Sequence, residues 1–270
     1  MKVAVIILGP IQQIKNSQNK DIEYNHWNEI NLKVLKGCDL YIHTDDNYKQ
    51  IAEQFNPVKL ITTENSYWQD TKNIYLEKYS DLIRETENSI PEGVHFNANF
   101  GRIAQWKRLN EVLNQVDLSE YDYIVKWRLD LMKFGTHQMH VDILYNFKSI
   151  YSSIGNDYGG LYQYIKQENF KKDYLYTFKD FVYLTSYDNF LKSNLFPNID
   201  EYITKKEEAF TYKEEVFNSS NMKDRLKCVE TQWLDSSNKP FIHLFTSETA
   251  WLLNCLQQNV VIKNIFTPFV

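Results

Sequence analysis

An arginine and a carboxylate stand two residues apart, as Arg128 and Asp130, just after an apolar run at 123–125. In an extended chain, residues i and i+2 point to the same side, so both side chains could reach one ligand. The guanidinium suits phosphate oxygens, and the carboxylate suits a divalent metal or a sugar hydroxyl. The alternative is an ion pair that closes a strand at the surface, which the tripeptide by itself favours.

Two further turns follow apolar runs. Gly9 and Pro10 come after the run Val3–Leu8, and Gln12 follows them. These residues could line a nucleotide pocket or form an ordinary turn between a strand and a helix. At 43–46 (HTDD), adjacent carboxylates could bind a metal or a ribose, or Asp45 could cap the next helix. Neither a glycine-rich dinucleotide fingerprint nor a P-loop occurs, which disfavours ATP or NAD chemistry through those motifs.

A predicted helix carries Arg102 and Gln105 three residues apart, so that the two side chains are neighbours. They could reach a base or phosphate if the start of that helix faces the ligand. Ser247 and Glu248 begin another predicted helix, where capping and the helix dipole alone would favour the carboxylate. His137 and His140 have a spacing that metal sites use, but no third ligand accompanies them.

The elements that must position these residues follow from the apolar pattern. Runs at 3–8, 39–44 and 58–62 predict strands, with helical segments between them, so we expect βαβ units and a parallel sheet. Gly37 is expected to end the first helical segment. Beyond these runs the sequence predicts strands starting at 121, 180 and 260, helices over 48–55, 70–87, 100–116, 186–195, 205–227 and 247–258, a loop over 90–96, and irregular structure over 135–175.

Composition bounds the class of protein. The chain has 270 residues, 43% of them hydrophobic and 24% charged, which is enough to build a sizeable core. Its 30 Lys and Arg against 35 Asp and Glu give a net charge of −5, unlike a general nucleic-acid binder. No apolar run is long enough to span a bilayer, and three widely spaced cysteines predict no disulfide framework. We therefore expect a cytoplasmic protein with a single domain over 1–270.

The order of these segments resembles that of bacterial surface-polysaccharide glycosyltransferases of the WavE-like, lipopolysaccharide-synthesis type. The resemblance is carried by VAVIILGPIQ, DLYIHTDD, FGRIAQWKRLNEVL, YDYIVKWRLDLMKF and SETAWLLNCLQQNVVIK, within 1–134 and about 178–265. Those proteins look like GT-A-type enzymes in which Arg-x-Asp replaces Asp-x-Asp. They often carry an arginine shortly after the glycine turn, where this chain has Gln12 and Gln13.

The resemblance implies a GT-A-like, Rossmann-like α/β fold, with a mostly parallel sheet flanked by helices and an embellished C-terminal part. Residues 1–134 would form the donor half, and residues 135–270 the acceptor half. The implied reaction moves a sugar from a nucleotide-sugar donor to a growing capsule or lipopolysaccharide glycan. A non-catalytic nucleotide- or glycan-binding subunit of a polysaccharide assembly complex is the alternative, followed by a two-carboxylate glycoside hydrolase.

The same resemblance distributes roles among the candidate residues. Asp130 would bind a metal or the sugar, and Glu248 or Asp180 would supply the carboxylate on the acceptor side. Either Mn²⁺ or Mg²⁺ would suit Asp130, and a reaction without metal is equally compatible. The donor would contact Gly9, Pro10, Gln12, Arg102, Gln105, Arg128 and Asp130.

A lipid-linked acceptor would bring the protein to the inner face of the cytoplasmic membrane for part of its cycle. The segment 162–179 mixes Lys166, Lys171, Lys172 and Lys179 with many Tyr and Phe residues. Such a mixture could rest on an anionic membrane surface. The simpler interpretation, which the pattern favours, is a solvated loop whose aromatic side chains face the core.

Overall fold

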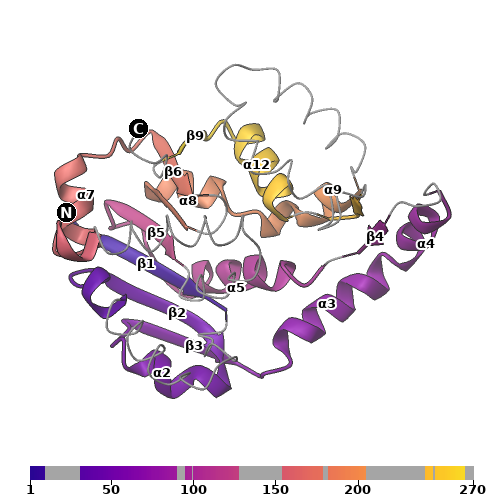
Figure 1. Cartoon of the computed structure of the whole chain (residues 1–270), viewed down its shortest axis with the longest axis horizontal. Helices are drawn as coiled ribbons and strands as arrows, with labels where there is room; N and C mark the ends of the chain where they lie inside the picture. The colour runs from indigo at the N-terminus through magenta and orange to yellow at the C-terminus, as the bar shows by residue number, and fades with distance from the viewer. Residues whose placement is uncertain are drawn as a thin grey trace. The chain divides into compact units, whose positions relative to one another are not determined.

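The chain is an α/β protein whose computed structural model describes residues 1–9, 31–89, 95–98, 100–127, 154–178, 182–204, 241–245 and 247–264 (Figure 1). It forms two compact units, each built from separate stretches of the sequence. The first unit comprises Met1–Asn65, Val112–Phe190 and Ile262–Val270, and the second comprises Ser66–Glu111 and Leu191–Val261.

Four parallel strands form one side of the main sheet. They are β1 (Val3–Leu8), β2 (Asp39–Asp45), β3 (Lys59–Thr63) and β5 (Tyr123–Trp127), in the order β3-β2-β1-β5. In register, β1 pairs with β2 on one side and with β5 on the other. Every residue of β1 and β5 is buried, because both faces of the central strands are covered.

Three further strands complete a seven-stranded sheet within the described residues. These are β7 (Val182–Thr185), β6 (Tyr174–Phe178) and β9 (Val261–Asn264), in the order β5-β7-β6-β9. The strand β7 runs antiparallel to both β5 and β6. Only three residues connect β6 to β7, which is too few for a crossover between parallel strands. The prediction of a mostly parallel α/β sheet flanked by helices is therefore confirmed, and β7 runs antiparallel to its two neighbours.

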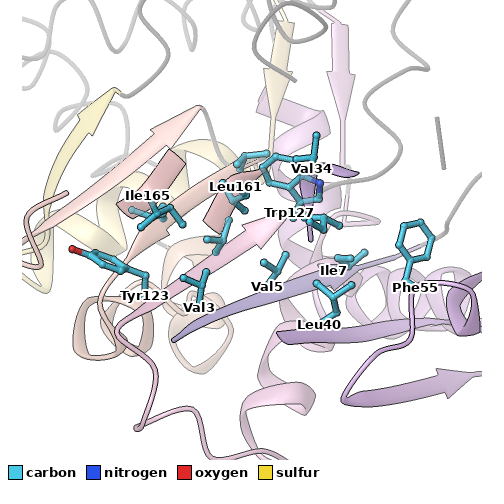
Figure 2. Packing of buried hydrophobic residues seen from close by; sticks show 14 of the residues in the cluster. Val3, Val5, Ile7, Val34, Leu40, Phe55, Tyr123, Trp127, Leu161 and Ile165 are labelled. Atoms are coloured by element: carbon cyan, nitrogen blue, oxygen red, sulfur yellow. The ribbon is translucent and has the colours of Figure 1, made fainter. Parts of the chain in front are cut away.

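One face of this sheet packs into a hydrophobic cluster (Figure 2). Alternate residues of each strand point into it, among them Val5 and Trp127. The helix α7 (Leu161–Glu168) adds Leu161 and Ile165, whose spacing of four residues places them on one side of the helix. The short helix α2 (Lys49–Glu53), which follows the 3-10 helix η1 (Asp46–Tyr48), adds Ala52 to the same cluster.

The second unit is mainly helical. Its elements are α3 (Tyr67–Lys78), α4 (Ser80–Ser89), most of α5 (Ile103–Leu113), the 3-10 helix η3 (Phe196–Asn198), α9 (Ile199–Thr204) and α12 (Ser247–Gln257), with a small parallel sheet of β4 (His95–Asn97) and β8 (Phe241–His243). The remaining helix, α8 (Tyr187–Lys192), follows β7. Trp106 of α5 is buried and stacks on Trp251 of α12, as its core position in the sequence predicts.

Three predicted segments differ from the structure. The loop expected over 90–96 includes the first two residues of β4. The polar helix expected over 70–87 is two helices, which separate at Tyr79, where the backbone leaves the helical conformation. The Tyr79 hydroxyl donates to Asp200, 121 residues away, so a distant contact stabilises this break. The irregular structure expected over 135–175 contains α7 and the start of β6.

Two glycines precede α7 and set where it begins. Gly159 and Gly160 both have positive φ, and Gly160 is the N-cap from which α7 begins. Gly37 also has positive φ, in agreement with its predicted role at a helix end. The helix expected over 205–227 lies outside the described residues. No helix in the described part of the chain is both long and apolar enough to cross a membrane.

Candidate functional site

The strand order creates a switch point beside β1. From β1 the chain moves outward through β2 to β3, and later returns to the other side of β1 as β5. In open α/β sheets, ligands bind outside the carboxyl ends of the strands at such a reversal. The ends of β1, at Leu8, and of β5, at Trp127, therefore mark the candidate site in the first unit.

Gly9 is the first residue beyond β1 at this edge. Its φ is +91°, a backbone conformation that residues with a side chain rarely adopt. Its N–H donates to the carbonyl of His43 over 2.9 Å, which fixes the turn against the end of β2. No described heavy atom lies within 4 Å of where a Cβ would stand, so the edge is open there. This geometry suits the close approach of a ligand to the backbone.

The end of β2 carries three buried polar residues, His43, Thr44 and Asp45. The hydroxyl of Thr44 is buried and makes no hydrogen bond within the described residues, while its carbonyl accepts from Thr63 at the end of β3, over 3.3 Å. Asp45 occupies the N-cap position of η1, but its side chain makes no capping hydrogen bond. The pKa of Tyr48 is raised by burial and by the negative charge of Asp45.

A buried lysine approaches the same edge from β5. Lys126 is fully buried, and its ammonium lies 5.6 Å from the ring centre of the equally buried Tyr183. The register places Lys126 beside Ile6 and Tyr183, on the face of the sheet opposite to the hydrophobic cluster. A cation over an aromatic ring is stabilised more strongly when water is excluded. The sequence interpretation missed Lys126, although its position two residues before Arg128 is a usable signal.

The turn between β6 and β7 belongs to this edge as well. Because β7 is antiparallel to β5, it begins where β5 ends, and β6 ends at the same side. The chain leaves β6 at Phe178 and enters β7 at Val182, so Asp180 belongs to the connection between them. Asp180 itself lies outside the described residues, as do Pro10, Gln12, Arg128 and Asp130. Arg128 directly follows Trp127, the last residue of β5.

Arg102 and Gln105 lie at the start of α5, in the second unit. Arg102 is exposed and stands immediately before the first residue of the helix, and its carbonyl accepts from the N–H of Gln105 over 3.2 Å. The side-chain nitrogen of Gln105 is buried and has no hydrogen-bond partner within the described residues. Both residues therefore lie at the start of α5, and their role as donor contacts stays a prediction.

The predicted helix start at Ser247 is confirmed, since α12 begins there and Ser247 is buried. Glu248 is the second residue of α12, close to the positive end of the helix dipole. The role of Glu248 stays a prediction. Within the described residues, no group of three or more His, Cys, Asp or Glu side chains could hold a metal ion.

The aromatic residues of 162–178 pack against one another instead of projecting together from the surface. Phe170 meets Tyr164 and Tyr176 edge-on, with ring centres 5.5 and 4.7 Å apart. All three are partly buried against the hydrophobic cluster. Lys172 pairs with Asp122 over 2.7 Å. This packing favours the interpretation of core-facing aromatic residues over that of a membrane-binding surface.

Comparisons with protein-family models, with characterised proteins and with solved structures gave no match to this chain.

Proposed function

We propose that this protein is a glycosyltransferase that moves a sugar from a nucleotide-sugar donor to a growing capsule or lipopolysaccharide glycan. The observation that carries the proposal is the switch point between β1 and β5. Open α/β sheets bind their ligands at such a switch point, and the sheet is compatible with a Rossmann-like fold. In the sequence, Gly9 directly follows β1 and Arg128 directly follows β5. We also propose that the fold is of the GT-A type.

In the proposed reaction, Arg128 neutralises the diphosphate that leaves the sugar, and the backbone at Gly9 lets the nucleotide approach the sheet. Arg102 and Gln105 contribute to the donor site, together with Pro10 and Gln12. The acceptor hydroxyl is activated or bound by a carboxylate, either Glu248 or Asp180. Asp180 follows β6 in the sequence, and β6 ends at the same edge as β5. Most of the catalysis then comes from positioning and charge stabilisation.

Asp130 has two proposed roles, as a ligand for Mn²⁺ or Mg²⁺ and as a contact for the donor sugar. Carboxylate oxygen is a suitable ligand for either ion, and Mg²⁺ is commonly held by one or two carboxylates together with substrate phosphates. The proposed glycosyl transfer takes place in the cytoplasm, and at the inner face of the cytoplasmic membrane when the acceptor is lipid-linked.

A thermal-shift screen of nucleoside diphosphates and nucleotide sugars, with and without Mn²⁺, tests the donor site. A ligand at 100 times its dissociation constant stabilises the fold by about 2.7 kcal/mol, which is about 5 °C for a chain of this size. We expect one nucleotide series to give such a shift and to lose it in Arg128→Ala. If no nucleotide shifts the melting temperature, the donor site is not where we propose it.

Turnover of the matching nucleotide sugar then separates the roles of the carboxylates. Asp130→Asn should lower kcat by about 10²-fold or more, because a charge that acts in the transition state is lost. Glu248→Gln and Asp180→Asn compete for the acceptor role, and the variant that loses transfer but keeps donor binding identifies the base. Nucleotide binding without turnover would instead indicate a binding subunit, and cleavage of a glycan without any nucleotide would indicate a hydrolase.

A further inference from the structure

An exposed tryptophan on α3 is held in place by the backbone of a glycine. Trp68 is 46% exposed, although large apolar side chains are usually better covered. A Cβ placed on Gly101 would lie only 2.2 Å from Cζ2 of the indole and 2.7 Å from Cε2. The edge of the ring therefore rests directly on the backbone of Gly101, in a position that only glycine permits. Both residues belong to the second unit.

The neighbouring contacts make the start of α3 rigid. Tyr67 donates its hydroxyl to Glu111 over 2.7 Å, and its ring lies 4.8 Å from the Lys107 ammonium and 4.7 Å from the Arg108 guanidinium. Tyr67 thus anchors the first turn of α3 to α5, next to Trp68. An indole that is fixed in this way loses little side-chain entropy when it binds a partner.

A cation lies beside the indole. The ammonium of Lys72, one helical turn beyond Trp68, lies 5.5 Å from the ring centre. Asp70 is an exposed carboxylate in the same turn, but residues two apart in a helix do not face each other, so Asp70 points away from Trp68. A partner at this surface therefore meets an aromatic ring with a cation beside it.

We infer that Trp68 and Lys72 form an acceptor-binding platform for an acidic glycan, one that carries carboxylate groups on its sugar rings. The apolar C–H face of a sugar packs on the indole, while a carboxylate pairs with the Lys72 ammonium. The inference rests on the proposed function, because it names the acceptor of the same transfer. It also assigns Gly101 a positioning role, since this residue sets where the indole stands.

A membrane surface is a less suitable partner for this region. Docking of α3 on lipid would need its exposed apolar residues on one side of the helix. Ile74 is 54% exposed, but it follows Trp68 by six residues, a rotation of about 240° around the helix. The two side chains therefore do not share a face, and charge complementarity favours a soluble acidic glycan.

Isothermal titration without any donor tests the platform. The probes are tetragalacturonate and an α2,8-linked sialic acid tetramer, with maltotetraose as the neutral counterpart. We expect at least one acidic probe to bind about 10-fold more tightly than the neutral one, and Trp68→Ala to weaken that binding by about 10-fold or more. Lys72→Met should weaken it several-fold. Ile74→Ala, which removes an equally exposed apolar side chain of α3, should leave it unchanged.

Gly101→Ala provides an independent test, because it displaces the indole without removing it. We expect Gly101→Ala to lose glycan binding as Trp68→Ala does. The double variant with both substitutions should bind no more weakly than Trp68→Ala alone. Circular dichroism verifies that each variant is folded. The inference is overturned if no acidic probe binds more tightly than maltotetraose, or if Trp68→Ala binds as the wild type does. It is also overturned if Trp68→Ala loses only binding to vesicles of phosphatidylglycerol and phosphatidylethanolamine. Nucleotide turnover is measured separately, so failure here leaves the proposed transfer reaction standing.

Discussion

At the scale of single residues, glycine serves two different purposes in this chain. Gly9 is required for its backbone angle, since its φ is +91° and open space surrounds the position of a Cβ. Gly101 is required for space, because the indole of Trp68 occupies the position of a Cβ. The same substitution therefore has a different physical cost at each of the two positions.

Gly9→Ala should lower the free energy of unfolding by about 1–2 kcal/mol, the cost of holding an L-residue at positive φ. Gly155→Ala is the matched control, because its new Cβ would meet only Val34, at an ordinary 3.5 Å, and its φ is not in the left-handed region. We expect the control to stay within about 0.5 kcal/mol of the wild type in urea unfolding. Equal losses in both variants would mean that the turn at Gly9 does not depend on its backbone angle.

At the scale of elements, Asp122 connects the beginnings of β1 and β5 to the residues before β6. It accepts from the backbone N–H of Lys2 over 2.9 Å and pairs with Lys172 over 2.7 Å. The hydrogen bond from Lys172, followed by that from Lys2, lowers the pKa of the Asp122 carboxyl. Because the side chain is 38% exposed, solvent screens these interactions, and their effect on stability is modest.

The lowered pKa gives a pH-dependent prediction. A carboxyl whose pKa is lower in the folded state stabilises the protein fully above its unfolded pKa of about 3.9. That contribution disappears as the pH falls through the folded pKa. Asp122→Asn should therefore lower the free energy of unfolding at pH 7 by up to about 1 kcal/mol, and the difference from wild type should vanish in strong acid. Asp173→Asn, which removes an exposed carboxylate beside Lys172, is the control, and denaturant titrations at pH 7, 5 and 3 measure both.

At the scale of the whole molecule, stretches that are distant in the sequence build each unit. The hydrophobic cluster of the first unit joins Val5 and Val125 in the N-terminal half to Leu161, Ile165 and Leu184. The proposed donor half, 1–134, would lack the last three of these residues. Its sheet would expose apolar surface that the complete chain buries, at a cost of about 25 cal/mol per Å².

We therefore expect a fragment of residues 1–134 to unfold without a cooperative transition and to bind a hydrophobic dye. The complete chain should unfold cooperatively and should not bind the dye. Thermal melting followed by circular dichroism, together with dye fluorescence, measures this. A fragment that unfolds cooperatively and binds a nucleoside diphosphate would contradict the expectation, and would show that residues 1–134 form a donor domain by themselves.

Much of the candidate site could be predicted from local sequence. Gly9 is visible because it ends a continuous apolar run, and the helix start at Ser247 is visible as a cap followed by an apolar face. Lys126 was missed because the aromatic ring that stabilises its buried ammonium belongs to Tyr183, on a strand more than 50 residues away. The platform at Trp68 was missed for the same reason, since Gly101 lies more than 30 residues away, in the turn before α5.

The sequence by itself determined where the strands β1, β2, β3 and β5 lie, because a buried strand needs a continuous apolar run and a turn after it. Only the tertiary structure decided that β5 returns beside β1, that β7 runs antiparallel between β5 and β6, and that β4 pairs with β8. It also decided that α3 and α4 separate at Tyr79. The physical reason is that apolar runs depend on neighbouring residues alone. Strand order and helix breaks depend instead on which distant surfaces bury each other, and these contacts must offset the entropy of closing the loops between them.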